Sequence, residues 1–253
     1  MAIAGFWSNW GKDSGGGPGE NESASLPVPP ADLSHVQTRQ LTYEEGAEEW
    51  PAISPDGVQL LYSGDAGGAR NLYIKNLATE EIRQLTDNPY DEIMGKWTPD
   101  GKTIVFVRGT RAGDRVELSD VYAGFYADGG DIYRLDVETG EERRIVDDAF
   151  NPSISNDGTQ LAYHRQIRSG AIRIHISTME GAMERAIGEL DSEDIEHVEP
   201  CWCPDGNRIA FRKYERPRSH VFVYNVETHT EYQLTDARDF PDTNPVWSPA
   251  GDF

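Results

Sequence analysis

The sequence predicts an all-β protein, a β-propeller of four-stranded antiparallel blades, and three observations carry this prediction. A short pattern recurs several times along the chain. Each copy places a tight-turn signal between two apolar runs, and two more apolar runs follow before the next copy begins. Repeats of roughly 40 to 50 residues that hold four short strands are typical of propeller blades.

The repeated pattern centres on a turn such as Pro55-Asp56-Gly57. Proline presets φ, aspartate bonds the nearby backbone, and glycine tolerates a positive φ. The copies span residues 51–62, 95–106, 152–163 and 200–211, and a shorter fifth copy spans 245–253. The turn aspartates Asp56, Asp100, Asp157 and Asp205 are about 44, 57 and 48 residues apart, so the second repeat contains an insertion.

The second strand of each repeat is apolar on both sides. Leu60 and Tyr62 are two residues apart and share one face, while Leu61 between them is apolar as well. The other copies follow the same rule. A strand that is apolar on both faces belongs to a sheet packed between two others.

The third and fourth strands complete each predicted blade. Third strands are expected at 72–74, 132–134, 172–174 and 221–223, and fourth strands at 82–86, 143–146, 185–187 and 232–235. The predicted blades span 47–87, 91–148, 149–190 and 196–236, within a propeller of residues 36–253.

The two ends of the propeller region predict a partial blade. Residues 36–43 copy a fourth strand, and residues 243–253 begin with a first strand. We therefore expect a piece of a ring of about six blades. Its open edge would expose apolar faces and favour self-association.

Residues 1–35 predict no packed structure. A short apolar head, Met1–Trp7, is followed by a linker rich in Gly, Ser and Pro. No signal peptide is visible, and no apolar run is long enough to span a bilayer. The head is interpreted as a disordered start, with the trailing end of a membrane anchor as the alternative.

The net charge of −21 excludes several partners. With 44 acidic against 23 basic residues, the surface repels phosphate backbones and anionic lipids, so nucleic-acid binding and docking on anionic lipid are not expected. Without a long apolar run, membrane insertion is not expected either.

Cys201 and Cys203 are the two cysteines. Both are interpreted as small buried fillers, because residues two apart on a strand make a strained disulfide and no further cysteine completes a zinc site.

The pattern Trp97-Thr-Pro-Asp-Gly-Lys-Thr-Ile-Val-Phe106 resembles the repeat of the TolB-like, WD-related propellers. More loosely, the insertion at 108–130 and the run 131–140 resemble propellers attached to bacterial membrane-anchored Ser/Thr kinases. The resemblance implies a sensing or scaffolding module that binds a protein or peptide outside the cytoplasm, in the periplasm.

The loops before each first strand are the candidate ligand face, because such loops gather around the central channel of a propeller. The candidates are Glu49, Trp50, Glu92, Met94, Phe150, Asn151, His197, Glu199 and Asn244. In the insertion, the aromatic residues of 120–126 indicate either a contact surface or a cover for the blade.

The sequence predicts a protein without catalytic residues and without a cofactor. Motifs of serine hydrolases, phosphate-binding loops and zinc peptidases are absent from the sequence. A divalent cation held by Glu49, Glu92, His197 and Glu199 is left open. The alternative functions are the accessory propeller of a peptidase and a metal-dependent propeller lyase.

Overall fold

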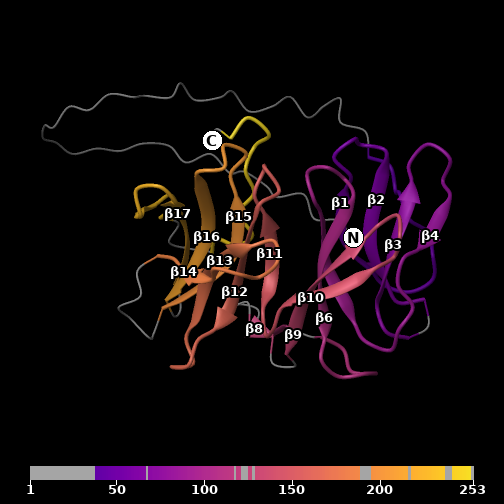
Figure 1. Cartoon of the computed structure of the whole chain (residues 1–253), viewed down its shortest axis with the longest axis horizontal. Coiled ribbons are helices and arrows are strands. Elements are labelled where there is room, and N and C mark those ends of the chain that lie inside the picture. The colour runs from indigo at the N-terminus through magenta and orange to yellow at the C-terminus, as the bar shows by residue number, and fades with distance from the viewer. Residues whose placement is uncertain are drawn as a thin grey trace, which may run out of the picture. The chain divides into compact units, whose positions relative to one another are not determined.

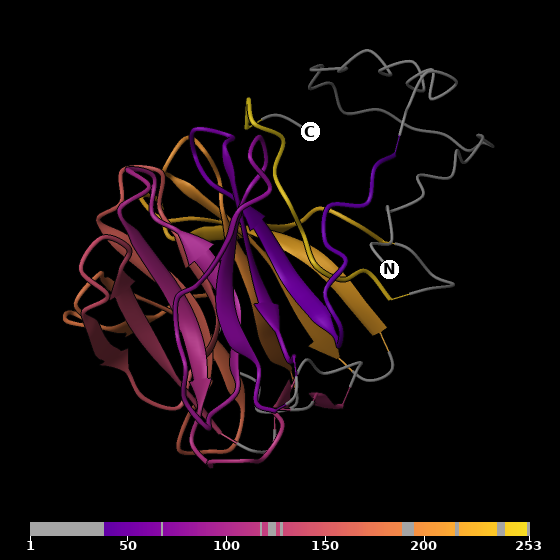
Figure 2. The ribbon, with the colours of Figure 1, turned by 90° about the vertical axis from the view of Figure 1, so that its right-hand side faces the viewer.

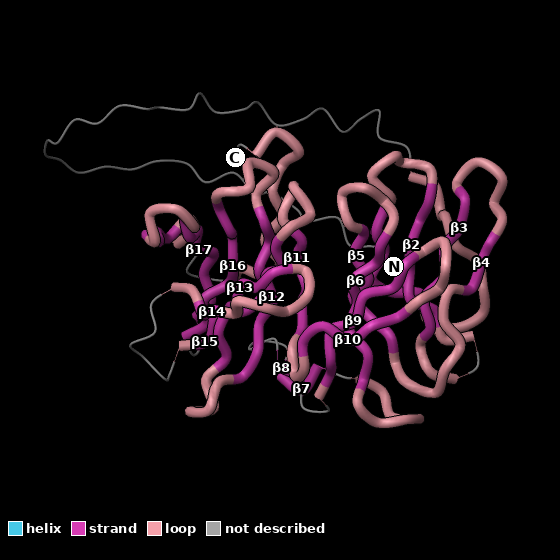
Figure 3. The backbone as a smooth tube through the Cα atoms, in the orientation of Figure 1, coloured by secondary structure: helices cyan, strands magenta, loops and turns pink. Residues whose placement is uncertain are grey.

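A computed structural model describes residues 38–66, 68–116, 118–120, 125–126, 129–188, 195–215, 218–236 and 241–251. Leu41–Phe253 form one compact unit. The described residues form strands, turns and loops, and none of them forms a helix (Figure 3). The predicted head and linker of residues 1–35 lie outside the described residues.

Four antiparallel four-stranded sheets follow one another along the chain, which confirms the predicted propeller fold (Figure 1). The first blade contains β1 (Glu48–Ile53), β2 (Gln59–Gly64), β3 (Asn71–Asn76) and β4 (Ile82–Gln84). The second contains β5 (Glu92–Trp97), β6 (Thr103–Gly109), β9 (Gly130–Asp136) and β10 (Glu142–Val146). The third contains β11 (Phe150–Ile154), β12 (Gln160–Gln166), β13 (Ile172–Thr178) and β14 (Arg185–Ala186). The fourth contains β15 (Glu196–Trp202), β16 (Arg208–Glu215), β17 (Arg218–Asn225) and β18 (Thr230–Gln233).

The insertion of the second blade forms a separate small sheet. Strands β7 (Leu118–Asp120) and β8 (Phe125–Tyr126) pair with each other between β6 and β9. The side chains of residues 120–126 lie outside the described residues, so the two interpretations of this aromatic segment both stand.

The turn between the first and second strands is built as its sequence predicts. The carboxylate of Asp56 accepts the Ser54 hydroxyl at 2.5 Å and the Val58 amide at 3.0 Å. Gly57 closes the turn with φ of 75°, a conformation that glycine adopts without steric cost. Corresponding bonds hold Asp100 and Asp157.

The core of the molecule lies between the blades. Leu61 and Leu72 of the first blade pack with Ile104 and Phe106 of the second. Because β6 is apolar on both sides, Val105 turns the other way and packs with the third blade. A further cluster joins the third and fourth blades. Figure 2 shows the violet first blade beside the magenta second blade.

Tryptophans connect the first strands of neighbouring repeats. The indole Nε1 of Trp97 donates to the carbonyl of Ala52 at 3.2 Å, and that of Trp247 donates to Cys201 at 2.9 Å. Trp202 occupies the same repeat position, yet its buried Nε1 has no hydrogen-bond partner within the described part of the chain.

The partial blade expected from residues 36–43 and 243–253 is not formed as strands. Residues 38–47 and 241–251 contain no strand, because no described strand pairs with them. The later segment still covers part of the fourth blade, since Trp247 packs on Ala210, Val221 and Val223. Self-association through an open edge stays a prediction.

None of the described residues forms a helix long and apolar enough to cross a membrane.

The tryptophan hydrogen bonds lead to a first prediction. Replacing Trp97 by benzothienylalanine keeps the ring shape but removes the N–H donor. We expect the free energy of unfolding to fall by about 1 kcal/mol. The same replacement at Trp202 should not destabilise the protein, because the buried N–H there is unpartnered. Urea unfolding of the two variants measures the difference, and equal losses at both positions would contradict the assignment.

The turn aspartates lead to a second prediction, for the acid side of stability. Hydrogen bonds from Thr98 and from the Lys102 amide hold the pKa of Asp100 below its ordinary value of 3.8. A carboxyl whose pKa is lower in the folded state stabilises the fold above the unfolded pKa, and this contribution is lost as the pH falls through the folded pKa. Asp100→Asn should therefore lose stability at neutral pH but show a shallower decline below about pH 4. Thermal unfolding between neutral and acid pH tests this, and parallel curves for both proteins would refute it.

Candidate functional site

The first strand of every blade carries a β-bulge at the same place. The strand register shifts between Glu49 and Ala52 in the first blade and at the matching positions of the other three. The bulge residues Trp50, Met94, Asn151 and Glu199 have φ of 50°, 58°, 51° and 56°, and Asn244 of the fifth copy has φ of 51°. Non-glycine residues in this left-handed conformation cost about 1–3 kcal/mol each where the surroundings hold them in place. The same strained point thus recurs in five successive repeats.

The first strands of the four blades, together with residues 244–246 of the fifth copy, border one cavity of about 440 Å³, here called the axial cavity. Its lining residues are Ala52, Ile53, Pro55, Lys96, Trp97, Asn151, Pro152, Ser153, Ile154, Glu199, Pro200, Cys201, Asn244, Pro245 and Val246. Aliphatic, aromatic and proline side chains dominate, with a few polar groups among them. This composition and size are typical of a site that accepts a small ligand or a few side chains of a partner.

One residue of each repeat occupies an equivalent place in the wall, two positions after the bulge residue. These five residues are Ala52, Lys96, Ser153, Cys201 and Val246. Four of them are small or uncharged, and Lys96 alone is a cation. Any electrostatic preference at this level of the cavity therefore comes from one side chain.

The carboxylate in the cavity wall is already bonded. Oε1 of Glu199 accepts a hydrogen bond from Nη1 of the buried Arg212 at 3.0 Å, and Oε2 accepts the amide of Asn244 at 2.7 Å. The amide of Glu199 itself donates to Nδ1 of His164 at 3.3 Å. These groups hold the backbone of successive bulges in place.

Burial shifts the protonation of the groups around the cavity. Protein atoms around the cavity displace water and lower the pKa of Lys96, although this residue stays exposed. Burial raises the pKa of the Cys201 thiol, which therefore stays protonated at neutral pH. Burial also lowers the pKa of His164 to about 3, so this ring is neutral and can accept the Glu199 amide proton. The thiol is thus a poor nucleophile.

The sequence-predicted ligand residues separate into groups. Asn151, Glu199 and Asn244 line the axial cavity. Trp50 lies under the guanidinium of Arg70, with the Cζ atom 5.2 Å from the ring centroid, and Glu49 forms an ion pair with Arg70 at 2.9 Å. Both residues contact Arg70 and so keep its guanidinium beside the first bulge.

Four candidates do not lie at an open mouth, and the expectation that they do is wrong. Glu92, Met94, Phe150 and His197 are buried. The first strands start earlier than expected, at Glu92, Phe150 and Glu196. Strand pairing therefore turns these side chains into the packed space between blades.

The buried Glu92 and His197 have structural surroundings. Glu92 forms an ion pair with Arg108 and accepts from Asn88 at 2.8 Å, while burial raises its pKa. His197 packs on Phe211, with ring centroids 5.2 Å apart. Burial together with the charges of Arg173 and Lys213 lowers the pKa of His197 to about 3.

The hypothesis of a cation held by Glu49, Glu92, His197 and Glu199 has no geometric support, since Glu49, Glu92 and Glu199 are each bonded to a different arginine. Within the part of the chain that the structure describes, no group of three or more His, Cys, Asp or Glu residues could hold a metal ion.

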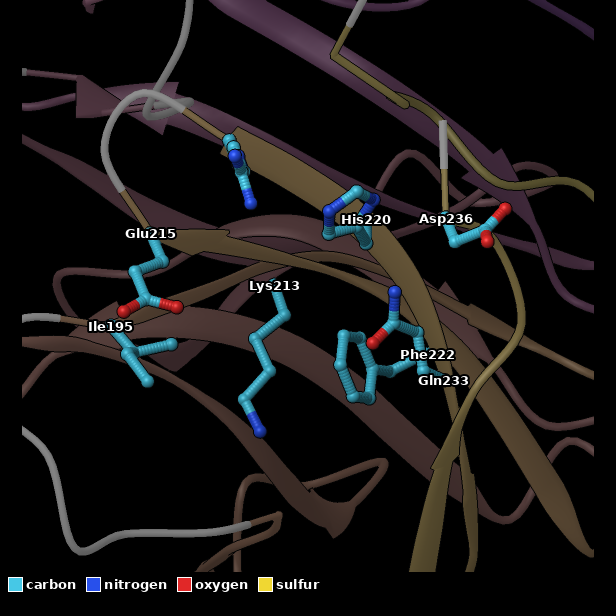
Figure 4. A pocket seen from close by; sticks show the side chains of 8 residues that line it. Ile195, Lys213, Glu215, His220, Phe222, Gln233 and Asp236 are labelled. Atoms are coloured by element: carbon cyan, nitrogen blue, oxygen red, sulfur yellow. The ribbon is translucent and has the colours of Figure 1, made fainter. Parts of the chain in front are cut away.

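A second cavity, of about 420 Å³, lies on the fourth blade (Figure 4). Figure 4 shows Lys213, Phe222 and Gln233 close together, with Ile195 and Glu215 to one side. The ammonium of Lys213 is bonded to Glu231 at 2.6 Å and lies 4.6 Å from the Phe222 ring centroid. The charge of Lys213 is therefore matched by a neighbouring carboxylate.

Sequence reasoning missed Lys96 and the equivalent residues of the other repeats. In the four blades they lie within the first strand rather than in the loop before it. Aligning the repeats on their Pro-Asp-Gly turns places these residues in one column, and that signal could have found them.

Antiparallel four-stranded sheets whose first strands all border one cavity define a β-propeller. The family model described as the TolB beta propeller domain matches residues 21–194, and the chain belongs to this family.

Curated relatives include a Tol-Pal system protein TolB from Francisella tularensis, 23% identical over 87% of this chain and 46% of that protein. An uncharacterized peptidase, YuxL, from Bacillus subtilis is 28% identical over 67% of this chain and 22% of the peptidase. The chain thus spans about half or less of the length of these relatives.

The crystal structure of TolB from Acinetobacter baumannii matches with a TM-score of 0.66 at 18% identity, over 83% of this chain and 48% of that one. An oligogalacturonate lyase in complex with manganese matches with a TM-score of 0.62 at 23% identity, over 78% and 55%. These two structures share the fold.

The buried ion pair at the cavity leads to a third prediction. Glu199→Ala leaves the guanidinium of Arg212 buried without its carboxylate, and we expect a loss of about 3–5 kcal/mol in unfolding free energy. The exposed pair of Glu180 and Arg134 is the matched control, and Glu180→Ala should cost at most about 1 kcal/mol. Chemical denaturation measures both. A loss at Glu199 no larger than that at Glu180 would show that the pair does not hold the bulge.

Proposed function

We propose that this protein is a non-catalytic binding module that takes a segment of a partner protein into its axial cavity. The observation that carries the proposal is the apolar wall of that cavity. Ile53 and Val246 line it and yet are 50% and 84% exposed. Large aliphatic side chains gathered in a hollow with a few polar groups are typical of a surface that binds a partner.

The state of the polar groups supports a binding role over a catalytic one. Glu199 is bonded to Arg212 and to the Asn244 amide, and Cys201 is held protonated by burial. A general base or nucleophile needs a group that is free to exchange a proton at its working pH. Membership of the TolB propeller family agrees with this role, because a named relative is a component of the Tol-Pal system.

A second candidate is the accessory propeller of a peptidase. It is favoured by the similarity to the Bacillus subtilis peptidase, of which this chain covers 22%. In that case too the chain would bind a polypeptide segment, and the chemistry would belong to another part of the protein.

Peptide selection tests the proposed function and gives a fourth prediction. Peptides selected from a random display library on the full chain should bind in the axial cavity. Val246→Glu should weaken their binding at least about tenfold, because it places a carboxylate in the apolar part of the wall. Fluorescence anisotropy of labelled peptides gives the dissociation constants.

Met183→Glu is the matched control, since Met183 is 85% exposed but does not line the axial cavity. It should leave binding unchanged. A library that yields no binder, or binders equally affected by both substitutions, would overturn the proposal.

A further inference from the structure

The ammonium of Lys96 has no counter-charge among the residues that the structure describes. Lys96 lines the axial cavity, water reaches its side chain, and no described residue forms an ion pair or hydrogen bond with it. The carboxylate of Glu199 lines the same cavity, but both of its oxygens are bonded elsewhere. The Cys201 thiol interacts electrostatically with Lys96, but burial keeps this thiol neutral, so it does not compensate the charge.

The surroundings of Lys96 differ from those of Lys213, which lines the cavity on the fourth blade. Lys213 on the fourth blade contacts the Glu231 carboxylate at 2.6 Å (Figure 4). Lys213 is buried and therefore needs a partner, because a buried cation without one costs free energy. Lys96 is exposed, so its ammonium stays solvated until a ligand covers it. The chain has 44 acidic residues, and none of the described ones is placed against Lys96.

The wall around Lys96 indicates what could neutralise it. The equivalent positions in the cavity wall hold Ala52, Ser153, Cys201 and Val246, none of which brings a carboxylate. Ile53 and Trp97 add apolar surface to the same cavity. A group that fits must carry one negative charge on an otherwise apolar body.

The charge of the whole protein narrows the ligand further. A net charge of −21 repels ligands with several negative charges, including phosphate chains. A single carboxylate suffers least from this repulsion and accepts a strong hydrogen bond from an ammonium.

We infer that the axial cavity binds a carboxylate carried by an apolar segment of the partner polypeptide, and that Nζ of Lys96 donates to it. This inference rests on the proposed function and names the chemistry that it recognises. The carboxylate belongs either to the C-terminus of the partner or to an Asp or Glu side chain. Lys96 is then the residue that determines specificity.

The test observes Lys96 directly in the full chain. The sequence contains five lysines, so selective ¹³C-lysine labelling gives a small set of side-chain NMR signals. The Lys96 signal is assigned by its loss in Lys96→Met. The probes are N-acetyl-Leu-Ala with a free C-terminal carboxylate, N-acetyl-Leu-Glu amide with a side-chain carboxylate, and N-acetyl-Leu-Ala amide without either.

We expect a saturable shift of the Lys96 signal with at least one carboxylate probe and none with the uncharged amide. The responding probe identifies the source of the carboxylate. In calorimetry, Lys96→Met should weaken binding of that probe at least about tenfold, while Lys96→Arg, which keeps the charge, retains it. Lys102→Met is the control, because Lys102 lies in the exposed turn of the same blade.

No shift with any carboxylate probe, or an equal shift with the amide, would overturn the inference. Display-selected peptides that still bind the cavity would leave the proposed function standing in that case. Thermal unfolding of Lys96→Met separates loss of binding from loss of fold. We expect this variant to melt close to the wild type, since Lys96 is exposed and its side chain forms no ion pair with a described residue.

Discussion

Each sheet of this protein has two apolar faces, and it can bury neither of them without a neighbouring sheet. Leu61 faces the second blade, whereas in β6 Ile104 faces the first blade and Val105 faces the third. Burial of apolar area is the largest favourable contribution to folding. Sheets that must be covered on both sides stack in sequence, and their first strands then converge on one cavity. The position of the candidate site follows from this packing.

Because the first strands converge on the cavity, the polar side chains near it form hydrogen bonds with the backbone amides of the bulge residues. The bulge of each first strand places one residue in the left-handed region, and an extra residue at a bulge leaves backbone groups without their usual strand partners. His164 accepts the amide of one bulge residue, and Glu199 accepts the amide of the next. Arg212 in turn neutralises Glu199. A wall secured in this way presents fixed surfaces to a ligand, which lowers the cost of ordering on binding.

The sequence predicted the features that depend on local chemistry. Turns at Asp56 and Asp100 and the double-sided strands were predicted correctly, because their signals lie within a few neighbouring residues. The surroundings of Glu92 and His197 were not predicted. Glu92 is bonded to Arg108 on the adjacent strand, and His197 packs on Phe211 and feels the charge of Arg173 on another blade. Such contacts depend on strand register and on how blades face each other, which the spacing of residues along the chain does not reveal.

The repeats separate the residues required by the fold from those free to differ. At the turn, Asp56, Asp100, Asp157 and Asp205 share one residue type, because the backbone amides there need the same acceptor. Two positions after the bulge, the five repeats carry Ala, Lys, Ser, Cys and Val. The fold thus accepts side chains of different size and charge at that place. Blade packing does not require the lysine found in one repeat, so its role concerns the chemistry of the cavity. A propeller scaffold can therefore carry different residues in the wall of its cavity while the packing between its blades is kept.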